Sequence, residues 1–407
     1  MAYVFVADDF TGASDTLATL ARGGYRARLF RDLPVGRDLE GIEAWGIATQ
    51  ARALGRGDMA ALAARIGAGL RRFEPGFLHL KICSTFDSSP EVGNIALLAQ
   101  VLADAAGLGD LAVLGGQPSL GRHAVFGTLF ARGPDGRIHR IDRHPVMAIH
   151  PVTPMHEADL IRHLASLGLN DLHHVPRGAR GGAFPRFYDA LDQADVVAAG
   201  QDLMYRGQRL LVMGASSVAE AWIAAQPPRP RTAPTLRRAE RPILCFAGSR
   251  SSLTTTQIGA AEGLARLPVN PADVMAQGPG LATATAWARE RLARGQDCLL
   301  YLTAENSGGI APADLATASA GLVLRILDGG AAGGLVVAGG DTSSAIVTAL
   351  SPDWLEYAAE LCPGVAILQA QIGEDRMSLA LKGGQMGGAD FFAQAIAAMR
   401  APKVPAA

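Results

Sequence analysis

The chain has 407 residues, with 37 basic and 38 acidic side chains, a formal net charge of −1 and 49% hydrophobic residues. This composition supports a large buried core, and the length favours two domains over one. No run of like charge stands out, which argues against the concentrated basic field that binds nucleic acids or membrane surfaces.

The cysteines are far apart and lie mostly inside apolar runs, so they are interpreted as reduced core thiols and not as disulfides or a zinc site. They are Cys83, Cys245, Cys298 and Cys362. The amino terminus reaches Asp8 too early for a signal peptide, and no apolar stretch approaches membrane-spanning length. We therefore expect a soluble cytoplasmic protein.

Short apolar runs alternate with helical patterns in the first half of the chain. Strands are predicted at residues 3–8, 44–49, 77–83 and 111–116, and helices at residues 12–24, 57–73 and 91–107. A less regular stretch, 121–180, is rich in His, Pro and Arg, and a strand and helix return at 209–225. This alternation predicts right-handed βαβ units and a mostly parallel sheet.

A proline- and arginine-rich segment without apolar periodicity, residues 226–242, is predicted to be an extended linker. Strand and helix segments alternate again at 243–249, 254–267, 297–304, 313–330, 334–342, 343–350, 364–370 and 377–388, with a final helix near 391–399. The predicted fold is α/β, with two domains, 1–225 and 243–407, each a mostly parallel sheet flanked by helices.

Two adjacent acids, Asp8 and Asp9, follow the first predicted strand, and the residues after them open a helix. In a parallel sheet, ligands bind beyond the carboxyl ends of the strands, which is where these acids stand. One acid can cap the helix by accepting backbone N–H groups. Two neighbours do not easily cap the same helix, so the other is predicted to accept hydrogen bonds from ligand hydroxyl groups. Gly12 allows close approach of the backbone.

A second polar loop follows another predicted strand in the sequence LKICSTFDSSPEVGN. It supplies Lys81, Ser84, Thr85, Asp87, Ser88, Ser89 and Asn94. Ser89 before Pro90 fits a helix N-cap with proline at the first helical position. Lysine is rarely buried unpaired, so Lys81 is predicted to reach an anion such as a sugar-acid carboxylate, or to pair with Asp8 or Asp9.

Three histidines in the irregular stretch stand six residues apart: His144, His150 and His156. This is not the i, i+4 spacing of a helical metal pair, so a metal site is disfavoured. Two roles stay open for Arg122, Arg143, His144 and His150: contact with an acidic substrate, or ordering of a long loop. Thr153, in TPMHEADL, is assigned a structural role at a helix start.

Three glycine-rich turns follow predicted strands in the second half: CFAGSRSSLTTTQI, LVVAGGDTSSAI and LALKGGQMGGADFF. Glycine backbones and helix N-termini hold phosphates through N–H groups. One such turn is weak evidence, because turns need glycine anyway. Three turns at strand ends in one domain predict a nucleotide site.

Several familiar motifs are missing from the chain. The sequence GQPSLGRH has the glycine spacing of a Walker A motif, but Arg122 stands in place of the lysine and no Ser or Thr follows. No GxGxxG follows the first strand, which disfavours a nicotinamide cofactor. GxSxG and HExxH are also absent, which argues against a serine hydrolase or a zinc protease.

Five blocks together resemble the four-carbon acid sugar kinases: ADDFTGASD, CSTFDSSPEVGN, GSRSSLTTTQI, AGGDTSSAI and LALKGGQMGGADFF. They occur in order between residues 8 and 392, and they are specific as a set. The resemblance implies an amino-terminal acid-sugar domain, a carboxy-terminal ATP domain and a substrate in the cleft between them. It also implies ATP and Mg²⁺ as cofactors.

The resemblance carries residue roles onto matching positions. It assigns substrate contacts to Asp8, Asp9, Thr11, Lys81, Ser84, Asp87 and Asn94. It assigns nucleotide contacts to Ser249, Ser251, Gly339, Gly340, Asp341, Thr342 and Gly384. Arg122, from the basic stretch, is added as a candidate substrate contact.

The block CSTFDSS resembles the 3-oxo-tetronate branch, whereas threonate and erythronate kinases more often carry a DSTLRGN-like loop. Two features depart from that branch. Gly383, Gln385 and Met386 replace Ser, Asn and Phe of a KSGNFG-like block, and residues 121–151 are longer and more basic. The first expectation is therefore 3-oxo-tetronate, with D-threonate, D-erythronate and 3-oxo-isoapionate as alternatives.

The implied activity is ATP-dependent phosphorylation of a terminal C4 hydroxyl, which needs positioning and charge stabilisation more than covalent chemistry. A carboxylate must accept or orient the hydroxyl proton. Asp341 is one candidate, and Asp8, Asp9 or Asp87 is another. The alternative from a different class is a non-catalytic sensor of sugar acids or nucleotides. Expected partners are a small acid sugar and ATP, without nucleic acid or membrane, and a homodimer is the usual arrangement for such an enzyme.

Overall fold

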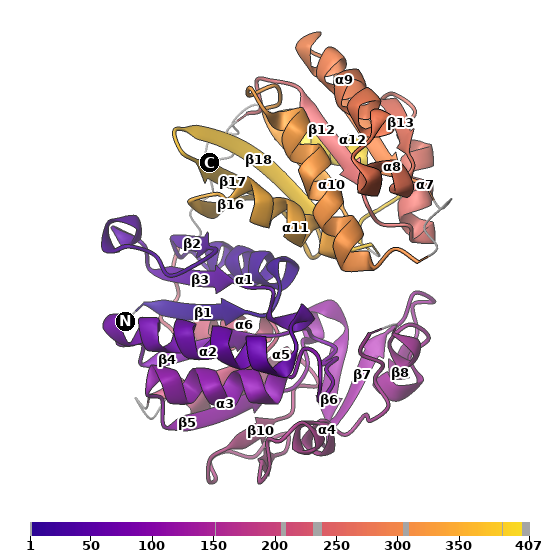
Figure 1. Cartoon of the computed structure of the whole chain (residues 1–407). Helices are drawn as coiled ribbons and strands as arrows, with labels where there is room; N and C mark the ends of the chain where they lie inside the picture. Colours follow the sequence, from indigo (N-terminus) through magenta and orange to yellow (C-terminus); the bar gives the residue numbers. More distant parts are fainter. Residues whose placement is uncertain are drawn as a thin grey trace. The chain divides into compact units, whose positions relative to one another are not determined.

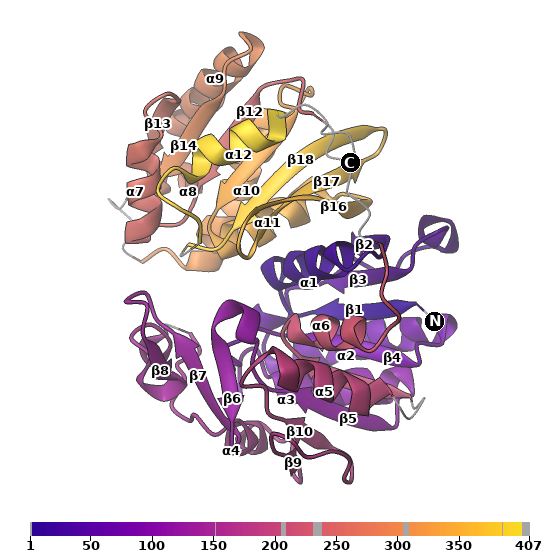
Figure 2. The same ribbon diagram turned by 180° about the vertical axis from the view of Figure 1, so that it is seen from behind.

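The computed structural model describes residues 2–150, 152–204, 209–230, 238–303, 309–384 and 386–400. The chain divides into two compact units, Met1–Thr232 and Ala233–Ala407, and each is an α/β fold (Figures 1 and 2).

The first unit contains a parallel sheet with the strand order β2-β3-β1-β4-β11-β5-β10-β9. The strands are β1 (Tyr3–Ala7), β2 (Ala27–Phe30), β3 (Ala44–Ala48), β4 (Phe77–Lys81), β5 (Asp110–Leu114), β9 (His173–Val175), β10 (Arg186–Tyr188) and β11 (Leu210–Gly214). Every residue of β1, β3, β4 and β11 is buried, as expected for apolar strands covered on both faces.

Helices cover both faces of this sheet (Figures 1 and 2). Helices α2 (Arg56–Leu70) and α3 (Ile95–Ala106) pack together on one face, and α1 (Phe10–Arg22), α5 (Gln193–Met204) and α6 (Ser217–Ala224) cover the other. Strand β1 leads to a helix on one face, while its neighbours β3 and β4 lead to helices on the opposite face. Its carboxyl end is therefore a topological switch point, the place where open α/β sheets bind ligands.

The stretch expected to be irregular contains a small antiparallel sheet of β6 (Arg122–Val125), β7 (Thr128–Arg132) and β8 (Ile138–Arg140), followed by α4 (Leu160–Ser166). Short 3-10 turns complete the unit: η1 (Gly36–Leu39), η2 (Ala51–Ala53), η3 (Arg71–Phe73), η4 (Pro118–Leu120), η5 (Ile141–Arg143) and η6 (Met147–Ile149).

The second unit has the strand order β13-β14-β12-β15-β18-β17-β16. The strands are β12 (Ile243–Ala247), β13 (Ala265–Val269), β14 (Cys298–Leu302), β15 (Gly334–Ala338), β16 (Trp354–Cys362), β17 (Val365–Ile372) and β18 (Asp375–Lys382). The pairs from β13 to β18 are parallel, whereas β16, β17 and β18 form an antiparallel meander.

One face of the second sheet carries α7 (Ser252–Ala260) and α12 (Phe391–Arg400). The other carries α8 (Pro271–Ala276), α9 (Pro279–Ala293), α10 (Pro312–Leu327) and α11 (Gly340–Leu350) (Figures 1 and 2). The aromatic side chains that begin α12 are fully buried in the core beside Cys245 and Val336 of the central strands. Within the part of the chain that the structure describes, every helix is too short or too polar to cross a membrane.

The α/β fold with mostly parallel sheets is confirmed. The helix expected to reach residue 267 is wrong at its end, because α7 stops at Ala260 and the following residues pair with β14 as β13. Strands β2, β10 and β16 and helices α5, α8 and α9 were not predicted. The described flanks of the predicted linker, 226–230 and 238–242, contain no helix or strand, and residues 231–237 lie outside the described residues. The linker and domain boundaries stay predictions.

Candidate functional site

Asp9 is the N-cap of α1. Its backbone is extended, and its Oδ1 accepts a hydrogen bond of 2.6 Å from the N–H of Gly12. Its Oδ2 lies 3.0 Å from Nη1 of Arg52. Of the two adjacent acids, Asp9 therefore caps the helix through Oδ1, while its Oδ2 pairs with Arg52.

Asp8 is 2% exposed and is held by the same arginine. Nη2 of Arg52 donates to both carboxylate oxygens, at 3.1 and 3.0 Å, and Nε donates to Oδ2 at 3.2 Å. Arg52 follows β3, which lies beside β1 in the sheet. Sequence analysis missed this residue, although a cation just after a predicted parallel strand was a signal that could have identified it.

Asp8 and Arg52 have displaced pKa values. Burial raises the pKa of Asp8 to about 6, with help from the charge of Asp9 and against the attraction of Arg52 and Lys81. Burial alone would lower the pKa of Arg52, but the charges of Asp8 and Asp9 raise it well above its usual range. The site thus combines a permanent cation with a carboxylate that titrates near neutral pH, an arrangement common at functional sites.

Lys81 ends β4 and is buried, with an exposed fraction of 4%. Its Nζ donates to the carbonyl of Ile82 at 2.7 Å. A Cβ added at Gly12 would lie 2.5 Å from this Nζ and 2.7 Å from Oδ1 of Asp9. The ammonium group therefore lies against the first turn of α1, and a side chain at position 12 would force Lys81 or Asp9 to shift.

Asp87 lies in the loop after β4 and is 5% exposed. Its carboxylate accepts hydrogen bonds from the hydroxyls of Thr85 and Thr153, at 2.5 and 3.0 Å. Burial alone would raise the pKa of Asp87, but Arg52, the two hydroxyls and the nearby His150 lower it overall. Asp87 therefore stays charged at neutral pH and is a weak proton acceptor.

The helix start predicted at Thr153 is wrong. Helix α4 begins at Leu160, its N-cap is Asp159, and no acid stands in its first turn. Thr153 instead places its hydroxyl on Asp87 and donates its backbone N–H to Nδ1 of His150 at 3.1 Å. The basic stretch thus reaches the acid cluster, which no local pattern predicted.

Asn94 is the N-cap of α3 and is 1% exposed. Its Oδ1 accepts from the N–H of Leu97 at 2.9 Å, and its Nδ2 donates to the carbonyl of Leu167 at 3.2 Å. The N-cap role predicted for Ser89 is therefore wrong, because the helix starts after Asn94. Both ends of the Asn94 amide bind the backbone, so its described contacts hold the loop in place.

Arg122 is not joined to the acid cluster by any contact among the described residues. Its Nη1 donates to the carbonyl of Leu120, and its Nε is buried without a partner. His144 accepts backbone N–H groups of the next turn at its Nδ1, so it orders the loop. Thr11, in the first turn of α1, and Ser84, in the loop after β4, are half-buried.

The three glycine-rich turns of the second unit come together, because β12, β15 and β18 are adjacent and parallel. The N–H of Ser249 donates to Ala338 at 2.9 Å. A Cβ added at Gly248 would lie 2.2 Å from Oγ1 of Thr342, and one at Gly384 would lie 2.6 Å from Oγ of Ser249. The turns pack too tightly for side chains at these glycines.

Hydroxyl groups at the start of α7 fix the turn after β18. Ser251 is the N-cap, and its Oγ donates to the carbonyl of Gly384 at 2.6 Å. Oγ1 of Thr254 donates to the same carbonyl at 3.2 Å. Nε2 of Gln257 donates to three further carbonyls of this turn, those of Met386, Gly387 and Gly388.

Helix α11 starts at Gly340 after Gly339, whose φ is +133° and which has no side chain to cap the helix. Its first-turn N–H groups are therefore uncapped by the N-cap residue, which is the feature that attracts phosphate. Asp341 in this turn is exposed, and Thr342 is buried. The predicted nucleotide residues thus lie in or beside three neighbouring turns. Gln385, which follows Gly384, lies outside the described residues.

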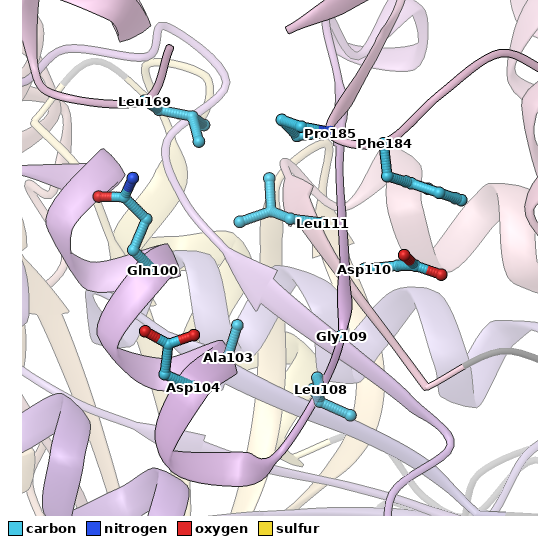
Figure 3. A pocket seen from close by; sticks show the side chains of 10 residues that line it. All are labelled: Gln100, Ala103, Asp104, Leu108, Gly109, Asp110, Leu111, Leu169, Phe184 and Pro185. Atoms are coloured by element: carbon cyan, nitrogen blue, oxygen red, sulfur yellow. The ribbon is translucent and has the colours of Figure 1, made fainter. Parts of the chain in front are cut away.

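A surface hollow of the first unit lies elsewhere (Figure 3). It adjoins the amino end of β5, whereas the acid cluster lies at the carboxyl ends of β1, β3 and β4. Its lining is Gln100, Ala103, Asp104, Leu108, Gly109, Asp110, Leu111, Leu169, Phe184 and Pro185. The hollow therefore does not belong to the acid cluster.

Comparison with known proteins places the two units in two domain families. A profile described as a sugar-binding N-terminal domain matches residues 3–222, and one described as a nucleotide-binding C-terminal domain matches residues 244–392. A 3-oxo-tetronate kinase of Methylobacterium radiotolerans is 32% identical, over 96% of this chain and 97% of that protein. A 3-oxo-isoapionate kinase of Paraburkholderia graminis is also 32% identical, over 95% and 92% of the two chains.

Solved structures show the same fold. A Salmonella typhimurium LT2 protein described as a tRNA synthase aligns with a TM-score of 0.79 at 23% identity, over 97% of this chain and 98% of that one. A Haemophilus influenzae protein of the DUF1537 family aligns with a TM-score of 0.67 at 21% identity, over 96% and 98% of the chains. At these identities the likeness concerns the fold alone.

Proposed function

The chain belongs to the four-carbon acid sugar kinase family, and we propose that it transfers the terminal phosphate of ATP to the C4 hydroxyl of 3-oxo-tetronate. The observation that carries the proposal is the acid cluster around Arg52 at the switch point of the unit that matches the sugar-binding family. The converging glycine turns of the other unit, which match the nucleotide-binding family, support ATP as the donor. A relative at the same identity is named 3-oxo-isoapionate kinase, so this branched acid is the second acceptor we propose.

In this proposal residues 1–225 bind the acid sugar and residues 243–407 bind ATP, with 226–242 as the linker. Within the acid-binding part, the carboxylates of Asp8 and Asp9 accept hydrogen bonds from sugar hydroxyls, and the ammonium of Lys81 attracts the substrate carboxylate. A site that contains both carboxylates and an ammonium group can bind the hydroxyl groups and the carboxylate of one small acid.

Two carboxylates are accessible enough to act on the reacting hydroxyl. Asp9 is 24% exposed and keeps its Oδ2 outside the helix cap, and Asp341 is exposed in the first turn of α11. Asp8 and Asp87 are buried and already bound by Arg52 and by hydroxyls. We therefore assign Asp341 as the group that accepts the proton and Asp9 as the group that orients the acceptor.

Mg²⁺ is proposed to be bound mainly by the phosphates of ATP. The described residues contain no group of three or more His, Cys, Asp or Glu side chains that could hold a metal ion. Kinase magnesium usually needs only one or two protein carboxylates besides phosphate oxygens. When bound, the ion neutralises charge on the phosphates.

The test is an ADP-release assay with ATP, Mg²⁺ and four acids: 3-oxo-tetronate, 3-oxo-isoapionate, D-threonate and D-erythronate. The highest kcat/KM is expected with 3-oxo-tetronate. ATP and acid binding without ADP release would instead favour a non-catalytic sensor. Because the reaction consumes ATP, we place it in the cytoplasm, and light scattering of the purified chain tests the expected homodimer.

A further inference from the structure

The last residue of β18, Lys382, is a buried lysine that the proposed mechanism does not use. Its exposed fraction is 0%. Its Nζ donates to Oγ1 of Thr254 and to the carbonyl of Gly383, both at 3.2 Å, and lies 5.4 Å from the ring centroid of Phe391. No carboxylate of the residues that the structure describes forms an ion pair with it.

A buried cation without a counter-ion is unfavourable, and lysines are almost never buried without a partner. Burial accordingly lowers the pKa of Lys382 to about 8, and the nearby Cys362 on β16 opposes this shift. Around Lys382, α7 contributes the hydroxyl of Thr254 and α12 contributes the ring of Phe391, neither of which carries a charge. Among the residues that the structure describes, none places a carboxylate against Lys382.

The position of Lys382 in the fold indicates which ligand supplies the missing negative charge. Its carbonyl accepts the N–H of Gly339 at 2.9 Å, so its backbone holds the turn before α11. Its side chain holds Thr254, whose hydroxyl binds Gly384 in the turn after β18. One residue thus ties together the turns that the proposed function assigns to ATP.

We propose that Lys382 is a positioning residue of the nucleotide site, whose unbalanced positive charge is completed by the phosphates of ATP. This inference rests on the proposed function, because it takes the glycine turns as the phosphate site. The phosphates favour the protonated lysine, and the protonated lysine fixes the turns through Thr254 and Gly383.

The proposal has a consequence that a purely structural lysine does not share. Negative phosphates raise the pKa of a nearby ammonium group, so nucleotide binding must take up protons where the free protein is partly neutral. At pH 8 we expect an uptake approaching about half a proton per nucleotide. Near pH 6, where Lys382 is already charged, its uptake falls close to zero.

The experiment is calorimetric titration of ADP into the full chain at pH 8, in two buffers of different ionisation enthalpy. Lys382→Met is expected to lose the proton uptake and to weaken ADP binding by about tenfold. Lys382→Arg, which stays charged at every pH, is expected to bind more tightly than the Met variant, without proton uptake. Replacing a buried unpaired charge by an apolar side chain rarely destabilises a fold, so Lys382→Met is expected to melt no lower than the parent chain.

Gln257→Leu is the matched control, because Gln257 holds the same turn through three carbonyls and carries no charge. It is expected to weaken ADP binding and to keep the proton uptake. Equal uptake in the parent chain and Lys382→Met would overturn the inference, as would ADP binding to the parent chain without any uptake. If the parent chain bound no nucleotide, the proposed function would fail together with the inference.

Discussion

The two polar regions of the molecule differ in whether their charged side chains are paired within the protein. In the first unit, Asp8, Asp9 and Asp87 surround Arg52, with Lys81 beside them, so most charges are balanced inside the protein. In the second unit, the glycine turns offer backbone N–H groups, hydroxyls and the unbalanced Lys382. A cluster whose charges are mostly paired can select a small acid by hydrogen-bond geometry. An unpaired cation attracts any polyphosphate.

The largest effect is expected when the central cation of the first region is removed. Arg52→Met leaves Asp8 and Asp9 as neighbouring acids without their cation, one of them buried. We expect a loss of about 3 kcal/mol in the free energy of unfolding and a loss of roughly 100-fold in kcat/KM. Denaturant unfolding and steady-state kinetics measure the two losses.

Arg52→Lys is the control for this substitution. It keeps the charge but not the planar fork that binds Asp8 through Nη2 and Nε, so partial recovery of stability is expected. An unchanged unfolding free energy in Arg52→Met would mean that the acids do not depend on the arginine.

The next effect separates chemistry from binding in the second region. Asp341 is exposed, so Asp341→Asn is expected to leave the fold intact while lowering kcat by at least about 100-fold. The KM values for ATP and for the acid are expected to change by less than about threefold. A kcat equal to that of the parent chain would remove Asp341 from the role of proton acceptor.

Glycine substitutions compare the two regions directly. Gly12→Ala pushes a methyl group against Nζ of Lys81, and Gly384→Ala pushes one against Oγ of Ser249. We expect the first to raise the KM for the acid about tenfold and the second to raise the KM for ATP by a similar factor. Gly321→Ala in α10 is the control, because no atom lies within 4 Å of its added Cβ and the residue belongs to neither proposed site. The same KM rising in both variants would contradict separate sites.

The last comparison concerns the titration of Asp8. Because its folded-state pKa of about 6 lies above the ordinary value of 3.8, its contribution to stability is complete below about pH 4 and is lost as the pH rises through 6. Asp8→Asn keeps a neutral side chain at every pH. The difference in unfolding free energy between the variant and the parent chain should therefore shift in favour of the variant between pH 4 and 7, and a flat difference would contradict the raised pKa.

Sequence patterns located the polar loops better than they located the partners within them. Asp8, Lys81 and the glycine turns were found because each follows an apolar strand, and the carboxyl ends of parallel strands share one edge of a sheet. Arg52 was missed because its role depends on β3 lying next to β1, and the order of strands in a sheet is not written in any local pattern.

Thr153 is a second residue whose partner was not predictable from the local sequence, and its partner is more distant in the chain. It reaches Asp87 across 66 positions of the chain, and its local sequence favoured a helix start instead. The N-cap of α3 was misplaced from Asn94 to Ser89 for a related reason. Both residues are good caps, and the hydrogen bond from Asn94 to the carbonyl of Leu167 joins positions that are distant in the chain.

The antiparallel meander of β16, β17 and β18 has a consequence for how the second unit folds. Its strands are joined by tight turns, so its contacts are local in the chain, whereas the parallel pairs of β12, β14 and β15 require helical crossovers. Structures of low contact order form fastest, because little loop-closure entropy opposes them. We expect the meander to form early in folding, and β18, which carries Lys382, then offers the edge on which β15 and β12 assemble.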